Sequence, residues 1–397
     1  MAIQVGVGQS AEKDHLLAAK EAVRLARLNF HSTKIDLVVV FSSVEFANTN
    51  VLKSLAELLG TDNIIGCSAA GVITNRGILK SGLAIMLLSL PEGAYLGTAN
   101  VRDIGTTTPL AAGQELGQKL TYGFKNIRRD FSLIFSDGLL RDGYGLISGL
   151  QERLGRSFPL AGASASDNLA FKKTYQYFNT EVLNDAACAI LWGGKLNFGL
   201  GVQHGWKPLG KPRYVTKSSG NIVYEIDGLP ASTVYKDYFA TDIVQLRKDL
   251  KRISILYPIG IYLSGEGEYL LRNLLYIQDN GALLFQGNVP QNSQIRLMIG
   301  TEESCLEATK QAVDEVKKGL LGRPCDFAFV FDSISRYILL GREANKEVET
   351  IKERLGKDTP IIGIYTCGEQ APLKAMDYHG MTYFHNQTIT ILGIGGY

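Results

Sequence analysis

The sequence lacks an excess of charge of either sign. Its 41 Lys and Arg residues nearly balance its 39 Asp and Glu residues, and the formal net charge is +2. Since nucleic acids and anionic membranes attract strongly basic proteins, this balance gives no reason to expect either as a partner. No stretch reaches the roughly 20 apolar residues of a membrane span, and the first residues lack the basic and apolar regions of a secretory signal. We therefore expect a cytoplasmic protein.

Cysteine and histidine are scarce, and their spacing excludes several kinds of site. The cysteines are odd in number and include no C-x-x-C pair, which fits neither a disulfide scaffold nor a zinc knuckle. No two histidines have H-x-x-x-H spacing, so we expect no resident metal. The residues concerned are Cys67, Cys188, Cys305, Cys325 and Cys367, and His15, His31, His204, His379 and His385.

Phosphate-binding loops are also missing. The sequence has no G-x-G-x-x-G between a strand and a helix and no G-x-x-x-x-G-K-[ST], so it supports neither a dinucleotide-binding fold nor a P-loop. What is present is an ordinary globular composition, with 45% hydrophobic and 20% charged residues over 397 positions. That length is typical of two or three domains.

One plan occurs three times along the chain: a buried strand, a loop, a helix closing on Leu-Gly, and a second strand that runs into a loop of small residues. The three copies start at Asp36, Asp130 and Asp326, and each reaches a phenylalanine five residues later. The glycines at which the second strand meets its loop are Gly66, Gly162 and Gly363. Repeats this far apart indicate duplicated domain parts rather than a solenoid, and they predict three equivalent turns.

These patterns predict an α+β fold of layered mixed sheets and helices, internally duplicated in three strand-helix-strand-turn-hairpin units. The apolar runs Leu83–Leu90 and Ala94–Val101 are separated only by a Pro-Glu-Gly turn, which predicts an antiparallel hairpin. Glycine and proline concentrate between Gly199 and Gly220. This concentration predicts a junction between an N-terminal domain, residues 1–205, and a C-terminal domain, residues 215–397.

The third unit carries two charged residues at neighbouring strand ends. Arg336 follows one strand, and Glu369 lies in the turn that contains Cys367 and Gly368. A planar guanidinium suits a carboxylate and a carboxylate suits an ammonium, so the pair predicts a site for a zwitterion at a pocket rim, to which Asn386 adds an amide. The alternative is a plain ion pair between Arg336 and Glu369.

Other candidates have equally plain alternatives. Asp167 and Asn168 end the second turn and are predicted to polarise a ligand, or else to bond their own backbone as turn residues do. Arg272 lies in an alternating strand and faces either a cleft or, as the alternation favours, solvent. Cys67 or Cys367 with His385 would allow a Cys–His enzyme, but no third orienting group is identifiable, and buried thiols are common.

Several segments carry a family resemblance in their order and spacing. They are NIIGCSAAGV, FPLAGASASDN, VTKSSGNIVYEIDGLPASTVY, YLLRNLLYIQDNGALLFQGNVPQNSQIRLM, PIIGIYTCGEQAP and HNQTIT. Together they resemble the FIST (F-box and intracellular signal transduction) family, bacterial proteins with an N-terminal and a C-terminal FIST domain, over nearly the whole chain. One position departs from the family pattern: an acidic residue usually follows the last glycine of the first turn, where this chain has Val72.

The resemblance implies an intracellular sensory module that binds a small molecule, such as an amino acid or a related metabolite. It would signal through a separate protein such as a histidine kinase or a cyclic-dinucleotide enzyme. Some relatives are haem-binding nitric oxide sensors, for which His204 beside Trp206 is the first axial ligand to test. The remaining alternative is a Cys-dependent hydrolase or transferase. We expect a protein that is not an enzyme and needs no cofactor.

Overall fold

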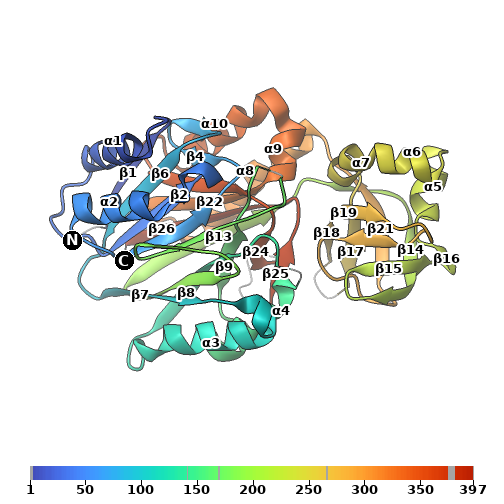
Figure 1. Cartoon of the computed structure of the whole chain (residues 1–397), viewed down its shortest axis with the longest axis horizontal. Coiled ribbons are helices and arrows are strands. Elements are labelled where there is room, and N and C mark those ends of the chain that lie inside the picture. The colour runs from blue at the N-terminus through green and yellow to red at the C-terminus, as the bar shows by residue number, and fades with distance from the viewer. Residues whose placement is uncertain (1–2, 141, 169, 265–266, 374–380, 397) are drawn as a thin grey trace.

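The computed structural model describes residues 3–140, 142–168, 170–264, 267–373 and 381–396. It has two parts (Figure 1). The body, residues 3–206 and 300–396, contains three six-stranded sheets, and the lobe, residues 207–299, contains one eight-stranded sheet. The described helices include none that is long and apolar enough to cross a membrane.

The body consists of three units with the same order of elements, except that unit 3 has an additional short helix, α9. Unit 1 has β1 (Gln4–Ser10), α1 (His15–Arg27), β2 (Leu37–Ser42), α2 (Thr49–Leu59), β3 (Ile64–Ser68), β4 (Val72–Thr74), β5 (Gly77–Leu79) and β6 (Leu83–Ser89). Unit 2 has β7 (Ala94–Val101), α3 (Pro109–Tyr122), β8 (Arg129–Ser136), α4 (Gly143–Leu154), β9 (Leu160–Ser164), β10 (Gln176–Phe178), β11 (Glu181–Leu183) and β12 (Ala187–Gly194). Unit 3 has β13 (Leu196–Gln203), α8 (Glu302–Gly319), β22 (Phe327–Ser333), α9 (Ile334–Leu340), α10 (Ala344–Leu355), β23 (Ile361–Thr366), β24 (Glu369–Pro372), β25 (Thr382–His385) and β26 (Ile389–Gly396). The predicted fold class with its threefold duplication is confirmed.

Each of the three body sheets is built around one parallel pair of strands: β2 with β3, β8 with β9, and β22 with β23. Gly66, Gly162 and Gly363 occupy the same register in these pairs, opposite Val40, Ile134 and Val330 respectively. The predicted equivalence of the three glycines is therefore confirmed, although each lies inside its strand, before the turn. Glycine is required there because an added Cβ would lie 1.8–2.1 Å from the carbonyl oxygen opposite.

The short hairpin of each unit completes the sheet of another unit. β4 and β5 extend the sheet of unit 3, β10 and β11 extend that of unit 1, and β24 and β25 extend that of unit 2. The three sheets thus close into a ring. Phe41, Phe135 and Phe331 come from equivalent positions of β2, β8 and β22, and their rings meet edge to face in the shared core, at centroid distances of 5.3 and 5.9 Å.

The predicted hairpin of Leu83–Leu90 with Ala94–Val101 is wrong. β6 pairs with β1 and β2 in the first sheet, whereas β7 pairs with β12 in the second. The Pro-Glu-Gly turn carries the chain from one sheet to the next. A turn signal marks where a strand ends, but pairing with partners distant in sequence decides which sheet the next strand joins.

The lobe is inserted into unit 3 between β13 and α8. Its elements are β14 (Lys207–Ser219), β15 (Ile222–Ile226), β16 (Leu229–Pro230), α5 (Thr233–Phe239), α6 (Ile243–Lys248), α7 (Leu250–Leu256), β17 (Ile259–Leu263), β18 (Glu268–Arg272), β19 (Leu274–Ile277), β20 (Leu283–Phe285) and β21 (Gln294–Ile299). It has a hydrophobic core of its own. The domain boundary predicted between residues 205 and 215 stays a prediction. The strand that precedes it, β13, pairs with the last strand of the chain, β26.

Candidate functional site

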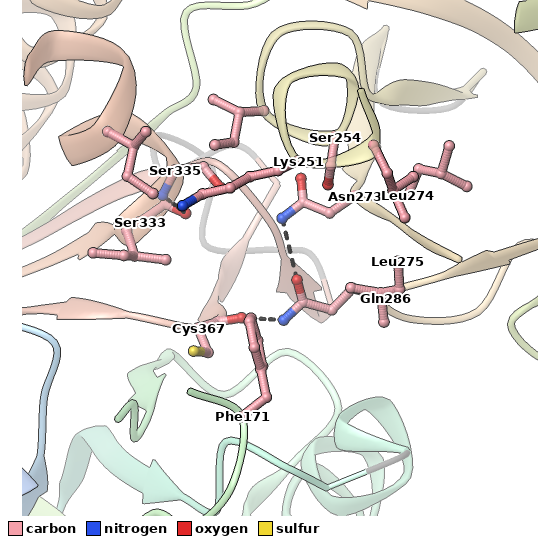
Figure 2. Close-up of a pocket in the computed structure, with 14 residues that line it drawn as sticks. Phe171, Lys251, Ser254, Asn273, Leu274, Leu275, Gln286, Ser333, Ser335 and Cys367 are labelled. Atoms are coloured by element: carbon pink, nitrogen blue, oxygen red, sulfur yellow. Dashed lines mark hydrogen bonds between the residues drawn. The ribbon is translucent and has the colours of Figure 1, made fainter. Parts of the chain in front are cut away.

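A cavity of about 340 Å³ lies where the lobe meets the body. We call it the lobe–body cavity. The body contributes the carboxyl ends of the parallel strands β22 and β23, the edge at which open sheets usually bind ligands, and the lobe contributes α7, β19 and the residue after β20 (Figure 2). The lining residues are Phe171, Leu250, Lys251, Ser254, Ile255, Asn273, Leu274, Leu275, Gln286, Ser333, Ile334, Ser335, Ile338 and Cys367.

A chain of amide groups forms one wall of this cavity. Asn273 donates from Nδ2 to Oε1 of Gln286 (3.1 Å), and Gln286 donates from Nε2 to the carbonyl oxygen of Cys367, as Figure 2 shows. The backbone N–H of Asn273 donates to Oδ1 of Asn386 (3.1 Å), which fixes the asparagine from the body side. The Oδ1 atom of Asn273 is buried and accepts no hydrogen bond from the described residues. The wall thus contains a desolvated acceptor.

Cys367 is the one predicted site residue that lines this cavity, and its thiol is not activated. Burial raises its pKa to about 12, and the nearby carboxylates of Asp167 and Glu369 add to that rise. Burial likewise raises the pKa of Cys67 well above its usual value. His385 makes its hydrogen bond through Nε2 with the carbonyl oxygen of Ala371 (3.0 Å). A thiolate nucleophile of the predicted Cys–His type therefore has no support in this geometry.

The predicted approach of Arg336 to Glu369 at a pocket rim is wrong. Arg336 lies in α9, is fully buried, and donates from Nε to Asp332 (2.8 Å) and from Nη2 to Glu347. Its remaining bonds go to the carbonyl oxygens of His204 (2.7 Å) and Cys305 (3.0 Å) and to Oγ1 of Thr309 (2.9 Å). Carboxylates from β22 (Asp332) and from α10 (Glu347) accept the hydrogen bonds of the guanidinium, so its fork does not face a ligand.

Glu369 is buried in β24 and is held by groups of its own unit. Its two oxygens accept hydrogen bonds from Oγ1 of Thr366 (2.7 Å) and from the backbone N–H of Thr388 (3.1 Å). Burial raises its pKa to about 8. The side chain is therefore largely protonated at neutral pH, which removes the anion that the predicted zwitterion site needed.

Strand register also corrects which residues are equivalent between the units. Glu369 pairs with Ala163 in the same way that Gln176 pairs with Cys67 and Val72 pairs with Ile364. The counterpart of Glu369 in unit 2 is therefore Gln176, not Asp167 or Asn168. Sequence spacing points to the wrong counterpart of Glu369, because the turn of unit 2 is longer than that of unit 3.

Asp167 and Asn168 act as turn residues in the structure. The carboxylate of Asp167 accepts hydrogen bonds from the backbone N–H groups of Phe171 (2.8 Å), Lys172 (2.7 Å) and Lys173 (3.0 Å). Asn168 is exposed with a φ of +57°. Asp167 thereby holds the loop that places Phe171 against the cavity.

The other predicted residues lie around the two sides of this junction. Gly368 packs against the ring of Phe384, where an added Cβ would lie 2.4 Å from the ring. Arg272 ends β18 and is buried, so the expectation that it faces solvent is wrong; it lines a second cavity, described below. His204 is half-buried, and its Nδ1 accepts a hydrogen bond from the backbone N–H of Trp206 (2.9 Å). It does not line the lobe–body cavity.

Sequence reasoning missed Asn273, Gln286 and Lys251. A signal for the first was available: Arg272 and Asn273 form a polar pair inside an otherwise apolar strand. Nothing comparable marks Gln286 or Lys251, since each reaches the cavity from an element whose position depends on the fold of the lobe. Within the described residues, no group of three His, Cys, Asp or Glu side chains is placed to hold a metal ion.

The sequence pattern of the FIST N domain matches residues 36–229, and that of the FIST C domain matches residues 231–372. The chain therefore belongs to the FIST family. The border between the two matches falls inside the lobe, at β16, so strands from both matched regions build the lobe sheet.

Similar chains occur in archaea and mycobacteria. An uncharacterized protein of Methanocaldococcus jannaschii is 27% identical over 68% of this chain, which spans 54% of that protein's length. Uncharacterized proteins of Mycobacterium tuberculosis and Mycobacterium bovis are 23% and 22% identical over 96% of this chain and 98% and 97% of their own lengths. Thus the mycobacterial proteins share the full two-domain length.

Two solved structures of cyanuric acid hydrolases also align with the chain. One covers all of both chains with 9% identity and a TM-score of 0.38, and one from A. caulinodans covers 98% of this chain and 99% of its own with 8% identity and a TM-score of 0.40. The expectation that the chain is not an enzyme is corrected by this finding, because the aligned structures are hydrolases. A likeness of this size assigns no activity to the chain.

Proposed function

We propose that this protein is a sensory module that binds a small molecule in the lobe–body cavity. The observation that carries the proposal is the Oδ1 atom of Asn273, a residue of the cavity wall: this buried acceptor has no donor among the described residues. A buried polar atom without a partner is destabilising, and such atoms in native proteins call for an explanation. A ligand N–H or O–H that donates to Asn273 supplies one.

The walls define the chemistry of that ligand. Leucine, isoleucine and phenylalanine side chains cover much of the surface, while Ser333 and Ser335 lie at one end, toward which Lys251 extends (Figure 2). A cavity of about 340 Å³ is at the small end of the range for ligand sites. These features support an amino acid or a related metabolite, with its carboxylate near Lys251 and its amine or amide near Asn273.

Transmission of the signal is part of the proposal. Because the amide chain of Asn273 and Gln286 joins lobe to body, a ligand that bonds to Asn273 favours one arrangement of the two parts over others. The output then passes to a separate signalling protein in the cytoplasm, such as a histidine kinase or a cyclic-dinucleotide enzyme. The FIST family membership supports this role.

The test is a thermal-shift screen of the purified protein against amino acids and related metabolites, followed by isothermal titration of the best compound. A ligand that binds only the folded state raises the melting temperature. Asn273→Ala should weaken that binding about fivefold, since it removes one desolvated hydrogen bond worth about 1 kcal/mol. Asn126→Ala, at an exposed asparagine outside the cavity, is the matched control.

Unchanged affinity in Asn273→Ala, or no stabilising compound among those screened, would count against the lobe–body cavity as the ligand site. An absorption spectrum of the protein as isolated belongs to the same experiment. A haem absorption band would direct attention to the gas-sensor alternative and to His204.

A further inference from the structure

Arg272 is a buried cation that has no counterion among the residues that the structure describes. Its side chain is only 4% exposed, and it forms no ion pair with any carboxylate of the described chain. Its hydrogen bonds all go to backbone carbonyl oxygens: Nε donates to Asn288 (3.0 Å), and Nη1 donates to Leu271 (2.8 Å) and Phe384 (3.0 Å). Buried charges in proteins are normally paired, so this one requires an explanation.

The hydrogen bonds of the Arg272 guanidinium to the described residues do not involve Nη2. Nε and both hydrogens of Nη1 are used, while the two N–H groups of Nη2 have no acceptor among the described residues. Burial lowers the pKa of Arg272 to about 10, so the group still carries its charge at neutral pH. Within the described part of the chain, Arg272 is thus a rigid cation with two N–H donors that have no acceptor.

A second cavity, of about 440 Å³, lies against Arg272. We call it the Arg272 cavity. It adjoins the lobe–body cavity, because Phe171, Leu275 and Gln286 line both. Asp142 also lines it, but its Oδ1 accepts a hydrogen bond from the backbone N–H of Gly145 (3.0 Å), and it lies beyond ion-pair distance of Arg272.

The backbone beside Arg272 is shaped around the guanidinium. Gly287 has a φ of +106°, and an added Cβ would lie 3.0 Å from Nε and 3.3 Å from Cζ of Arg272. The main chain can approach the guanidinium this closely only at a glycine. The carbonyl oxygen of Asn288, the next residue, then accepts from Nε. The lobe, through Asn288, and the body, through Phe384, therefore both fix the position of the guanidinium.

We propose that the Arg272 cavity binds a small anionic group, a carboxylate or a phosphate, through the Nη2 donors of Arg272. The anion supplies the charge that the fold leaves out, and the planar guanidinium gives directed bonds to its oxygens. This site is distinct from the one around Asn273. Its position next to that site allows an anion to bind beside the sensed molecule.

The first experiment uses the wild-type protein. Melting temperatures are measured in increasing sodium phosphate and sodium acetate, each against sodium chloride at matched ionic strength. We expect a saturable rise with phosphate or acetate that chloride does not give, and the two arms distinguish a phosphate from a carboxylate. No rise above chloride with either anion overturns the proposal.

Variants then test whether the anion binds at Arg272. Arg272→Lys keeps the charge but loses the fork, and we expect its affinity for the stabilising anion to fall at least tenfold. Arg354→Lys, the same exchange in an exposed ion pair with Asp314, should bind as the wild type does. Leu139→Trp fills the cavity from its partly exposed rim without altering Arg272, so it tests the site even where Arg272→Lys fails to fold. Wild-type anion affinity in Leu139→Trp, or in a folded Arg272→Lys, overturns the assignment.

Discussion

Two buried arginines show opposite ways of keeping a guanidinium inside a protein. Arg336 is surrounded by Asp332, Glu347 and Thr309, and its charge is neutralised within the body. Among the described residues, Arg272 donates only to backbone carbonyl oxygens. The first arrangement holds α8, β22, α9 and α10 together. The second leaves a positive charge that the described residues do not neutralise. The same residue type thus has a structural task in one place and a proposed binding task in the other.

Arg336→Met should lower the free energy of unfolding by about 3–5 kcal/mol, because it leaves the carboxylates of Asp332 and Glu347 buried without their cation. Urea unfolding followed by circular dichroism measures the loss. Arg354→Met, which breaks an exposed pair with Asp314, is the control and should cost about 1 kcal/mol or less. Equal losses of unfolding free energy in the two variants would show that burial of the Arg336 network does not determine its contribution to stability.

The raised pKa of Glu369 predicts how the stability of the protein depends on pH. Its pKa is raised to about 8 in the folded protein by burial, from a value of 4.5. The folded state therefore holds a proton that the unfolded state has lost, so this group's contribution to stability is complete below about pH 4.5 and is lost as pH rises toward 8. Glu369→Gln should flatten this part of the stability–pH curve, and Gln176 already occupies the equivalent position of unit 2.

Unfolding midpoints in urea between pH 5 and 8 test this prediction. The difference in stability between Glu369→Gln and the wild type should grow with pH over that window in favour of the variant. A constant difference would mean that Glu369 titrates at its ordinary value in the folded protein.

The residues of the site were predicted less well than the fold. Cys367 lines the lobe–body cavity, at a strand end that the repeat marks in the sequence. Arg336 and Glu369 were placed together because both follow strand ends, but Glu347 and Thr309 reach Arg336 from α10 and α8. Sequence spacing contains no information about such contacts between distant elements. Partners of buried charges were therefore the part that could not be predicted.

At the scale of elements, the parallel strand pairs impose the same steric limit three times. Gly162→Ala should lower the free energy of unfolding by about 1–3 kcal/mol, because its Cβ would lie 2.1 Å from the carbonyl oxygen of Ile134. Gly123→Ala is the control: this residue ends α3 with an ordinary φ of −78° and has nothing within 4 Å of the added carbon. Thermal unfolding of both variants should separate them clearly. If Gly162→Ala unfolds like the control, β8 and β9 pack less closely than described.

The buried strands expected at Asp36, Asp130 and Asp326 are β2, β8 and β22, and the ends of some helices are likewise marked in the local sequence. Pro109 at the start of α3, and Gly60 in the left-handed conformation after α2, are signals of this kind. The pairing of β4 with β23 was not predictable in that way, since the partners are almost 300 residues apart. Short strands of three residues also carry too little alternation to be recognised.

At the scale of the whole molecule, the lobe is an insertion whose two ends meet. Trp206 precedes it and Gly300 follows it, and an added Cβ on Gly300 would lie 2.4 Å from the Trp206 ring. Replacing residues 207–299 by a short Gly-Ser linker should therefore leave the three-sheet body folded, with a lower melting temperature because the hydrogen bond from Trp206 to Ile255 is lost. Cooperative thermal unfolding of this variant checks the prediction. An aggregated or non-cooperative product would show that the body depends on the lobe.

The exchange of hairpins between units has a consequence during synthesis on the ribosome. β4 and β5 leave the ribosome early, yet their partner β23 is made almost 300 residues later. At about 5–20 residues per second, the hairpin waits roughly 15–55 s before it can pair. Through that interval the buried face of Val72–Thr74 stays exposed on the nascent chain. We expect this hairpin to be the segment of unit 1 that chaperones contact, and the body to become protease-resistant only after β23 and β26 have emerged.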